Sequence, residues 1–485
     1  MAEGGGASSS QLQWLLGGGL GAREFLQDVF GQRPLHVARG AAAAQGPERF
    51  TVETLLALSE ARALVYARDL NVVNCLDGRR KVVLHEAGKA ARRAELSKHL
   101  TAKAGGCTVQ LFQPQRYEDW LWRVMSGLEA EFCSLWGASV YLTARGSQGL
   151  APHHDDVEVF VLQMQGRKHW RLHAPAPSQA QALEYSPDLS ELGELLMDVV
   201  LQPGDLLYLP RGTVHYAVAQ DEPSVHITLS THQNMSYYNL LDRAMPLMLD
   251  AAASTDVEMR RGLPHGFLSS NGVWRADRAA PSALVTNVAR LLRRIADSLE
   301  SSSVDEEESV AQALHEGVDA FAVDFISNRL PPYHAVAKMR HAKTLTVKSR
   351  LRLIDPNLLH VCIVQPGGDG EEEEEEEGEG EEAEQQPPQQ QQQQQRLEGA
   401  QEEDEYVLRV HHSLHNDRET HMGISEPSER SQVVDLDRGA LAFMGRLLAA
   451  YPAFELLDKL HPGGAAEALE WARALADERI VEWEP

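Results

Sequence analysis

Two histidines and one aspartate constrain this chain more than any other feature. His153 and Asp155 stand two residues apart in the run His153-His154-Asp155, and His215 follows about sixty residues later in the run Pro-Arg-Gly-Thr-Val-His. Two imidazoles and one carboxylate can occupy one face of an octahedral ferrous ion and leave positions open for an organic co-substrate and dioxygen. The pattern predicts a metal-dependent oxygenase whose fold brings a distant strand to the His-x-Asp motif.

The sequence around the motif favours strands. The apolar and β-branched run Val157–Met164 ends at a glycine and resumes as Lys168–Leu172, which predicts a hairpin. On a strand, residues two apart point to the same side. His153 and Asp155 can therefore reach one metal ion, while His154 faces away.

The third ligand and a nearby lysine fit the same hypothesis. His215 lies just beyond 203–210, a turn followed by a buried strand, and a barrel delivers such a strand to a distant site. Lys168 sits where a neighbouring strand can aim its ammonium at the far carboxylate of a dicarboxylic acid. Taken singly, each residue has a simpler interpretation: a surface His-Asp hydrogen bond, a polar strand end and a solvated strand lysine.

Several blocks of the chain resemble the JmjC-domain ribosomal oxygenases, and the resemblance spans nearly the whole chain apart from the extreme N-terminus and one insert. The blocks around the motif are 146–156, 166–170 and 203–215. Further segments resemble one branch of that family more closely, namely 68–72, 324–326, 329–333 and 413–422. The resemblance implies an Fe(II)- and 2-oxoglutarate-dependent dioxygenase that hydroxylates a histidine side chain of a large-subunit ribosomal protein, in ribosome biogenesis.

The resemblance also implies roles for particular residues. The iron ligands would be His153, Asp155 and His215; the 2-oxoglutarate-binding residues would be Lys168, Tyr141 and Ser230; and the substrate-binding residues would be Asn71, Gln110, Gln113 and Ser139. Two positions depart from the family pattern: Ser139 replaces an asparagine and His154 replaces a tyrosine. The first departure affects one polar contact near the metal, and the second adds a candidate ligand that strand alternation turns away.

The expected fold is α+β, in three parts after a disordered N-terminus at 1–20. A double-stranded β-helix, the cupin or jelly-roll core of a JmjC catalytic domain, is expected at 21–235. Apolar residues at helical spacing then predict a helical region at 236–333, which the resemblance makes a homodimerisation domain. The resemblance places a winged-helix domain at 334–485, interrupted at 366–405 by an acidic and glutamine-rich insert whose composition predicts disorder.

Charge and cysteine content bound the partners. The net charge is −26, of which the seventeen acidic residues and one arginine between 369 and 405 supply −16. Acidic residues in the last helix have the wrong sign for phosphate, so no direct nucleic-acid contact is expected. A basic ribosomal protein tail fits the charge better. Four cysteines without Cys-x-x-Cys spacing indicate reduced thiols of an intracellular protein, and no signal peptide or membrane span is expected.

Two alternatives stay open at this stage. A histone lysyl demethylase would direct the same chemistry at an N-methyl group and would act as a chromatin and transcription regulator. A non-catalytic JmjC scaffold would use its helices to hold partners, but a scaffold has no physical need for three metal ligands and a lysine. The address in the nucleus and nucleolus rests on resemblance alone, because no strong basic localisation cluster is present.

Overall fold

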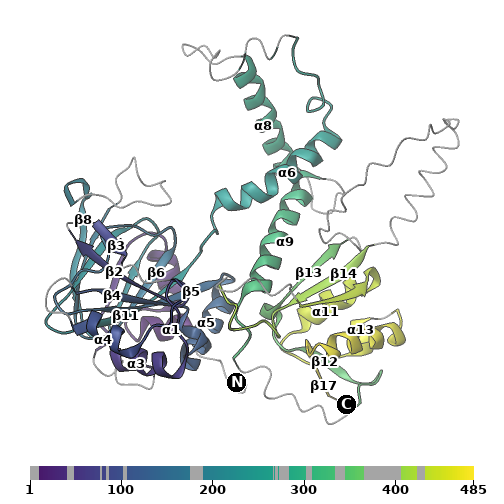
Figure 1. Ribbon diagram of the computed structural model, residues 1–485. Helices are drawn as coiled ribbons and strands as arrows, with labels where there is room; N and C mark the ends of the chain where they lie inside the picture. The colour runs from purple at the N-terminus through teal and green to yellow at the C-terminus, as the bar shows by residue number, and fades with distance from the viewer. Residues whose placement is uncertain are drawn as a thin grey trace, which may run out of the picture. The chain divides into compact units, whose positions relative to one another are not determined.

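The structure is a computed structural model that divides into two compact units, Met1–Gln233 with Ile326–Pro485, and Asn234–Phe325 (Figure 1). It describes residues 10–40, 48–76, 79–82, 87–101, 106–174, 189–265, 267, 271, 283–301, 309–333, 344–364, 406–422, 432–461 and 463–484. The insert predicted at 366–405 lies outside these residues. Among the described residues, no helix combines the length and apolar character needed to cross a membrane.

Two antiparallel sheets build the N-terminal part. The larger has the order β1-β9-β6-β11-β5-β4-β2-β3, with bounds β1 (Leu35–Val37), β9 (Leu206–Leu209), β6 (Glu158–Gln165), β11 (Ser224–Thr231), β5 (Trp136–Thr143), β4 (Thr108–Phe112), β2 (Leu70–Leu76) and β3 (Arg79–Val82). The smaller has the order β10-β7-β8, with bounds β10 (Val214–Ala219), β7 (Lys168–His173) and β8 (Leu195–Leu201).

An apolar layer joins the two sheets. Alternate side chains of β6 and β9 meet side chains of β7, β8 and β10 in one buried cluster, formed by Val159, Val161, Leu207, Leu209, Trp170, Leu172, Leu201 and Ala217. Residues two apart on a strand share a face, so the same β6 strand presents Phe160 and Leu162 to a second core on its other side. The predicted cupin-like core of an α+β protein is confirmed.

The expected hairpin between the two strands after the motif is wrong. Strand β6 pairs with β9 and β11, whereas β7 pairs with β8 and β10 in the other sheet. The chain crosses between the sheets at Gly166, which has φ 65° and lies so close to Pro223 that a Cβ atom would stand 2.3 Å from the Pro223 carbonyl oxygen. A glycine is required there, and it turns the chain out of the first sheet.

Helices cover the outer face of the larger sheet: α1 (Gln11–Leu16), α2 (Ala22–Asp28), α3 (Val52–Ala61), α4 (Arg93–Thr101) and α5 (Asp119–Phe132). The prediction of a disordered N-terminus at 1–20 is wrong for 10–20. Ser10 caps α1, and Leu12, Leu15 and Leu16 are buried in the main core. Their spacing forms one apolar stripe, which is stable as a short helix because it packs against the protein.

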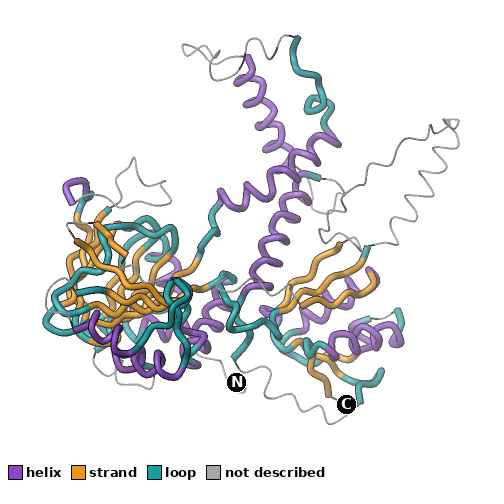
Figure 2. Tube along the Cα trace, in the orientation of Figure 1, coloured by secondary structure: helices purple, strands orange, loops and turns teal. Residues whose placement is uncertain are grey.

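The second unit is helical in its described part (Figure 2). Its helices are α6 (Tyr237–Thr255), α8 (Ala283–Ser301) and most of α9 (Val310–Asn328). Its small core contains Ala244, Met248, Ala252, Ile295, Val310 and Ala313. Many apolar side chains stay exposed on these helices, among them Tyr237, Leu241, Val285, Leu292 and Val318. The end of α9 and residues 329–333 belong instead with the larger unit, because Leu330 is buried in the main core.

In its described residues, the C-terminal region contains two small sheets and three helices around one core. The sheets are β16-β12-β17 and β13-β14-β15, with bounds β16 (Glu455–Leu456), β12 (Arg350–Leu353), β17 (Val481–Glu484), β13 (Leu359–Val364), β14 (Val407–His412) and β15 (Gln432–Asp437). The helices are α11 (Leu441–Ala450), α12 (Leu457–Leu460) and α13 (Ala465–Asp477). Phe443, Leu447 and Trp471 lie in their common core. The winged-helix assignment stays a prediction.

A buried polar cluster ties the segment after β14 to α5. His421 Nε2 lies 2.8 Å from Glu129 Oε1, and both side chains are fully buried. Gln115 Nε2 donates to His421 Nδ1 at 2.9 Å, and Glu129 Oε2 accepts from the Leu330 backbone N–H at 2.8 Å. The C-terminal region is therefore held to α5 by fully buried polar groups that pair with one another.

We expect His421→Ala to lower the free energy of unfolding by about 3–5 kcal/mol, because it leaves the Glu129 carboxylate buried with one partner missing. Urea denaturation followed by fluorescence measures this loss. His315→Ala is the matched control, since His315 is exposed on α9 and its loss should change stability little. Equal stability of the His421 and His315 variants would show that the buried pair contributes nothing net.

Candidate active site

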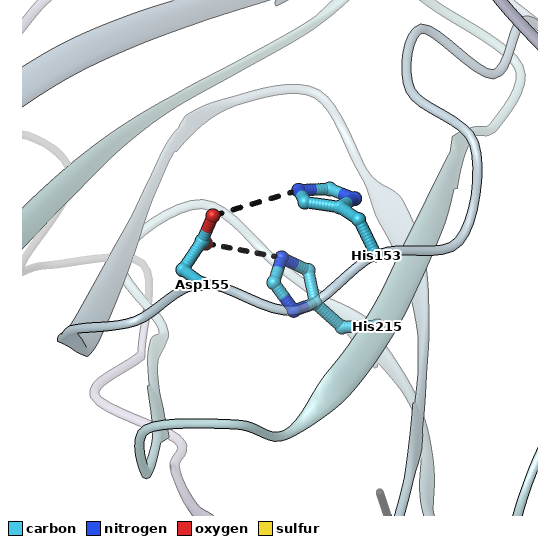
Figure 3. A group of neighbouring side chains, drawn as sticks. All are labelled: His153, Asp155 and His215. Atoms are coloured by element: carbon cyan, nitrogen blue, oxygen red, sulfur yellow. Dashed lines mark ion pairs between the residues drawn. The ribbon is translucent and has the colours of Figure 1, made fainter. Parts of the chain in front are cut away.

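The three predicted metal ligands come together, with their side chains pointing toward one another (Figure 3). His153 forms an isolated antiparallel bridge with His215 on β10, with backbone N–H donors reaching the partner carbonyls at 3.2 and 2.8 Å. Asp155 follows in the loop before β6, and its carbonyl oxygen accepts from Gly212 N at 3.0 Å. Asp155 Oδ1 lies 3.9 Å from His153 Nε2, and Asp155 Oδ2 lies 3.7 Å from His215 Nε2.

The hydrogen bonds of the two imidazoles fix which nitrogen faces the centre. His153 Nδ1 lies 2.8 Å from the Ala151 carbonyl oxygen, and His215 Nδ1 lies 3.0 Å from the Thr213 carbonyl oxygen. A carbonyl only accepts, so each Nδ1 carries the proton and each Nε2 keeps its lone pair for a metal. Burial, with help from His153, lowers the pKa of His215 to about 4, so this imidazole is neutral at physiological pH.

This donor set fits a divalent transition metal. One atom from each of His153, Asp155 and His215 lies within 4.8 Å of the other two, close enough for one ion to contact all three. Two imidazole nitrogens and one carboxylate oxygen suit Fe(II), and they leave the remaining coordination positions to small molecules. Asp155 is about two-fifths exposed, so the centre can be reached from solvent.

His154 stays out of the cluster, as strand alternation predicts. It is buried, and burial lowers its pKa. It is not one of the three residues whose ligand atoms converge.

We expect His154→Tyr to keep the Fe(II) affinity within about twofold of the parent value, because the side chain is not a ligand. For scale, a tenfold change in affinity corresponds to about 1.4 kcal/mol of binding free energy. Anaerobic titration with Fe(II) measures the affinity. The control is His153→Tyr, which removes an imidazole ligand from the neighbouring position and should lose the metal. Loss of iron in the His154 variant would show that the ligand face has been assigned to the wrong residues.

A cavity that is open to solvent lies between the sheets beside these ligands. It is lined by Thr108, Tyr141, Gly149, Leu150, His153, Asp155, Val159, Val161, Lys168, Trp170, His215, Tyr216, Ala217, His226 and Thr228. Both the metal ligands and Lys168 therefore belong to one cavity. The walls are apolar on β6 and polar on β5, β7 and β11.

Lys168 is a buried cation in this cavity. Its Nζ donates to Thr143 Oγ1 at 3.0 Å, lies 3.5 Å from His226 Nδ1, and lies 5.7 Å from the centre of the Trp170 ring. Burial lowers the pKa of Lys168 to about 7. In the described part of the chain this ammonium forms no ion pair with a carboxylate. An anionic ligand in the cavity would supply the missing charge.

One row of side chains runs across four strands toward this lysine. In register, Asn71 on β2 lies beside Gln110 on β4, Gln110 beside Tyr141 on β5, and Tyr141 beside His226 on β11. Gln110 Nε2 donates to the Tyr141 hydroxyl at 3.0 Å. Adjacent residues in register share a face of the sheet, so this row leads from β2, the neighbour of the edge strand β3, toward the cavity.

The cavity lining does not include the predicted residues Asn71, Gln110, Gln113, Ser139 and Ser230. Ser230 shares the face of His226 on β11, but lies at the strand end opposite Gly137. Ser139 shares the face of Tyr141 on β5. Gln113 follows β4 with φ 48°, and its side-chain oxygen accepts from Gln115 Nε2 at 2.7 Å. Of the predicted 2-oxoglutarate-binding residues, the cavity thus contains Lys168 and Tyr141.

Sequence reasoning missed several lining residues: Thr108, Trp170, His226 and Thr228. A signal for two of them was present. In the strand Ser224–Thr231, the polar residues His226 and Thr228 alternate with the apolar Val225, Ile227 and Leu229. Such alternation predicts one core face and one cavity face.

The chain is similar to known proteins over the region that contains these residues. Residues 110–240 match the model of the JmjC domain. The chain is 38% identical to ribosomal oxygenase 2 of Rattus norvegicus over 64% of this chain and 62% of that protein. It is 37% identical to ribosomal oxygenase 1 of Homo sapiens over 55% of this chain and 40% of that protein. The chain thus spans less than two thirds of the length of these relatives.

One further curated protein and one solved structure also match this chain. The bifunctional lysine-specific demethylase and histidyl-hydroxylase NO66 of Drosophila yakuba is 42% identical over 47% of this chain and 32% of that protein. Among solved structures, Escherichia coli ribosomal oxygenase YcfD aligns with a TM-score of 0.43 and 14% identity over 96% of this chain and 98% of that chain.

Proposed function

This chain contains a JmjC domain and is related to the ribosomal oxygenases, and we propose that it is an Fe(II)- and 2-oxoglutarate-dependent protein oxygenase. The observation that carries the proposal is the pairing of the His153, Asp155 and His215 cluster with the buried Lys168 in one cavity. A metal alone would need only the cluster. The uncompensated ammonium adds the site for a dicarboxylic co-substrate.

The residues of the chain divide the work. His153, Asp155 and His215 would hold Fe(II), which with 2-oxoglutarate and dioxygen supplies the oxidising chemistry. Lys168 binds the far carboxylate of the co-substrate by a charge-assisted hydrogen bond. The apolar walls at Val159 and Val161 exclude water on one side. The protein thus orients the co-substrate by its two ends.

The substrate that we propose is a histidine side chain in a basic tail of a large-subunit ribosomal protein. The names of the relatives and the acidic charge of this chain support it. The polar row through Asn71, Gln110 and Tyr141 offers amide and hydroxyl groups to an extended peptide at the cavity. Gln113 and Ser139 lie at the same end of β4 and β5 and would extend this contact.

Mass spectrometry tests the substrate. Purified protein with Fe(II), 2-oxoglutarate and ribosomal proteins from cells lacking the enzyme should add one oxygen to a histidine, with release of succinate. The Asp155→Ala protein is the control and should add none. Succinate release without any modified histidine would overturn the substrate, while no succinate under any condition would overturn the oxygenase itself.

Lysyl demethylation is the second candidate, and the name of the Drosophila relative favours keeping it. Oxidation of an N-methyl group releases formaldehyde, whereas oxidation of a histidine carbon does not. Incubation with methylated histone peptides and a formaldehyde assay separates the two reactions. We expect no formaldehyde, and release at the rate of succinate formation would favour the demethylase.

The remaining parts of the proposal concern assembly and location. The exposed apolar side chains of α6, α8 and α9 support a homodimer built by the helical unit. The strands and helices of the C-terminal region support a winged-helix domain that contacts protein, since α13 carries Glu467, Glu470 and Asp477. A protein of this activity would act in the nucleus and nucleolus, where ribosomes assemble.

The pKa of Lys168 predicts how the affinity for 2-oxoglutarate depends on pH. The Lys168 ammonium has a pKa of about 7 in the free protein, so it is present below that pH and is lost as the pH rises. We therefore expect affinity for 2-oxoglutarate to fall above pH 7, by up to roughly tenfold per pH unit. Calorimetry with Mn(II) in place of iron measures it without turnover. The Lys168→Met protein should bind 2-oxoglutarate weakly at every pH. If the affinity of the parent protein were equally independent of pH, the role assigned to Lys168 would be contradicted.

A further inference from the structure

The cavity contains one buried imidazole to which the proposed reaction has given no role. His226 lies on β11, is 3% exposed, and presents Nδ1 to the Lys168 ammonium at 3.5 Å, at the long end of the hydrogen-bond range. It is not one of the three residues that converge as metal ligands. A polar ring in such a position needs either a partner or a function.

Two aromatic rings fix the plane of this imidazole. Tyr141 stacks on it with ring centroids 4.9 Å apart and an interplanar angle of 5°. Trp170 approaches it edge to face at 5.2 Å and 81°. Both neighbouring rings pack against the imidazole and also line the cavity. Because of this packing, His226 has little freedom to turn, and its Nδ1 stays directed at the lysine.

The donors and acceptors around the lysine are consistent with one arrangement. An ammonium has three N–H donors and no acceptor. Thr143 Oγ1 at 3.0 Å takes one, and His226 Nδ1 takes a second only if the imidazole is neutral with its proton on Nε2. Burial and the adjacent Lys168 both lower the pKa of His226 well below its usual value, which keeps this tautomer neutral. The third donor is left for a ligand in the cavity.

We infer that His226 is a positioning residue for the co-substrate: its Nδ1 holds the Lys168 ammonium in the direction of the far carboxylate. This inference rests on the proposed function, because it assumes that 2-oxoglutarate is the anion. Through Tyr141 and Gln110, the same imidazole also joins the lysine to the polar row that leads to Asn71.

Two substitutions separate a positioning role from simple packing. His226→Asn puts an amide oxygen near the place of Nδ1 and keeps an acceptor for the lysine, whereas His226→Leu fills similar space without one. Binding of 2-oxoglutarate to the Mn(II)-loaded, full-length proteins is measured by calorimetry, without turnover. We expect His226→Leu to weaken binding about tenfold, the scale of one hydrogen bond to a charged group, and His226→Asn to weaken it by less than about threefold.

The same substitution in a Lys168→Met protein completes the test. If His226 acts through the lysine, His226→Leu should cause no further loss of affinity once the lysine is gone. Thermal melting confirms folding, and His226→Met replaces the leucine variant should that one not fold. An equal loss in both backgrounds, or no rescue by asparagine, would overturn the inference. A parent protein that does not bind 2-oxoglutarate at all would instead overturn the proposed function.

Discussion

Asp155→Ala is expected to abolish 2-oxoglutarate turnover while leaving the thermal unfolding of the protein nearly unchanged. The substitution removes the anionic member of the three-residue cluster, and the two neutral imidazoles that remain cannot offset the charge of Fe(II). The loss should exceed the roughly hundredfold that changes around a metal ligand can cause. Stability should hold because the carboxylate is two-fifths exposed and packs in no core.

Succinate formation at saturating Fe(II) and 2-oxoglutarate measures the effect, with thermal melting as the check on folding. Asp156→Ala is the matched control, because Asp156 is the next carboxylate along the chain and pairs with Arg211 at 2.6 Å instead of with the histidines. We expect that variant to retain most of its turnover. If the Asp155 variant still turned over 2-oxoglutarate when iron is added, the metal would have to be held by other residues.

The cluster could be predicted from the sequence because its chemistry is local. His153 and Asp155 are close in the chain, and the third ligand stands next to the buried strand 206–209. Residue types that bind metals, flanked by strands, indicate the site without knowledge of how those strands pair.

Strand pairing could not be predicted in the same way. The segments 158–165 and 168–173 satisfy every local criterion for a hairpin, yet they belong to different sheets. Two residues separate them, and only the close approach of Gly166 to Pro223, far along the chain, decides that the backbone crosses over. The order of strands in a sheet is set by such distant contacts and not by periodicity.

The burial of particular polar residues could not be predicted from the sequence either. His226 and Thr143 look like ordinary strand residues in the sequence, because their importance comes from Lys168, which reaches them from the other sheet. Likewise, residues 10–20 have glycines and a short apolar stretch that predict disorder, but α5 offers Glu131 to Ser10 and to the start of α1. Each case depends on a partner more than twenty residues away.

The lining of the cavity also changes which residues, besides Lys168, are candidates to bind 2-oxoglutarate. The sequence favoured Tyr141 and Ser230 as further contacts for 2-oxoglutarate, but only Tyr141 lines the cavity. Thr143 Oγ1 accepts from Lys168 Nζ at 3.0 Å, and it lies 2.9 Å from the hydroxyl oxygen of Thr108. Ser230 lies near the cavity along β11, and its role in binding 2-oxoglutarate stays a prediction.

Lys168→Ala is expected to raise the 2-oxoglutarate concentration needed for half-maximal turnover by roughly thirty- to a hundredfold, with Fe(II) affinity hardly changed. The substitution removes a charge-assisted hydrogen bond to the far end of the co-substrate, which contributes on the order of 2–3 kcal/mol, and it leaves His153, Asp155 and His215 in place. The buried ammonium has no carboxylate of the described chain beside it, so its loss strands no charge. The fold should therefore survive.

Succinate formation over a range of 2-oxoglutarate concentrations measures the shift, and anaerobic titration measures Fe(II) binding separately. Lys168→Arg should recover only part of the affinity, because a planar guanidinium does not fit a site built for a point charge between Thr143 and His226. The two variants together separate charge from geometry. Should Lys168→Ala titrate with 2-oxoglutarate like the parent, the far carboxylate must be bound elsewhere, and the Tyr141 hydroxyl would become the leading candidate because it lines the same cavity.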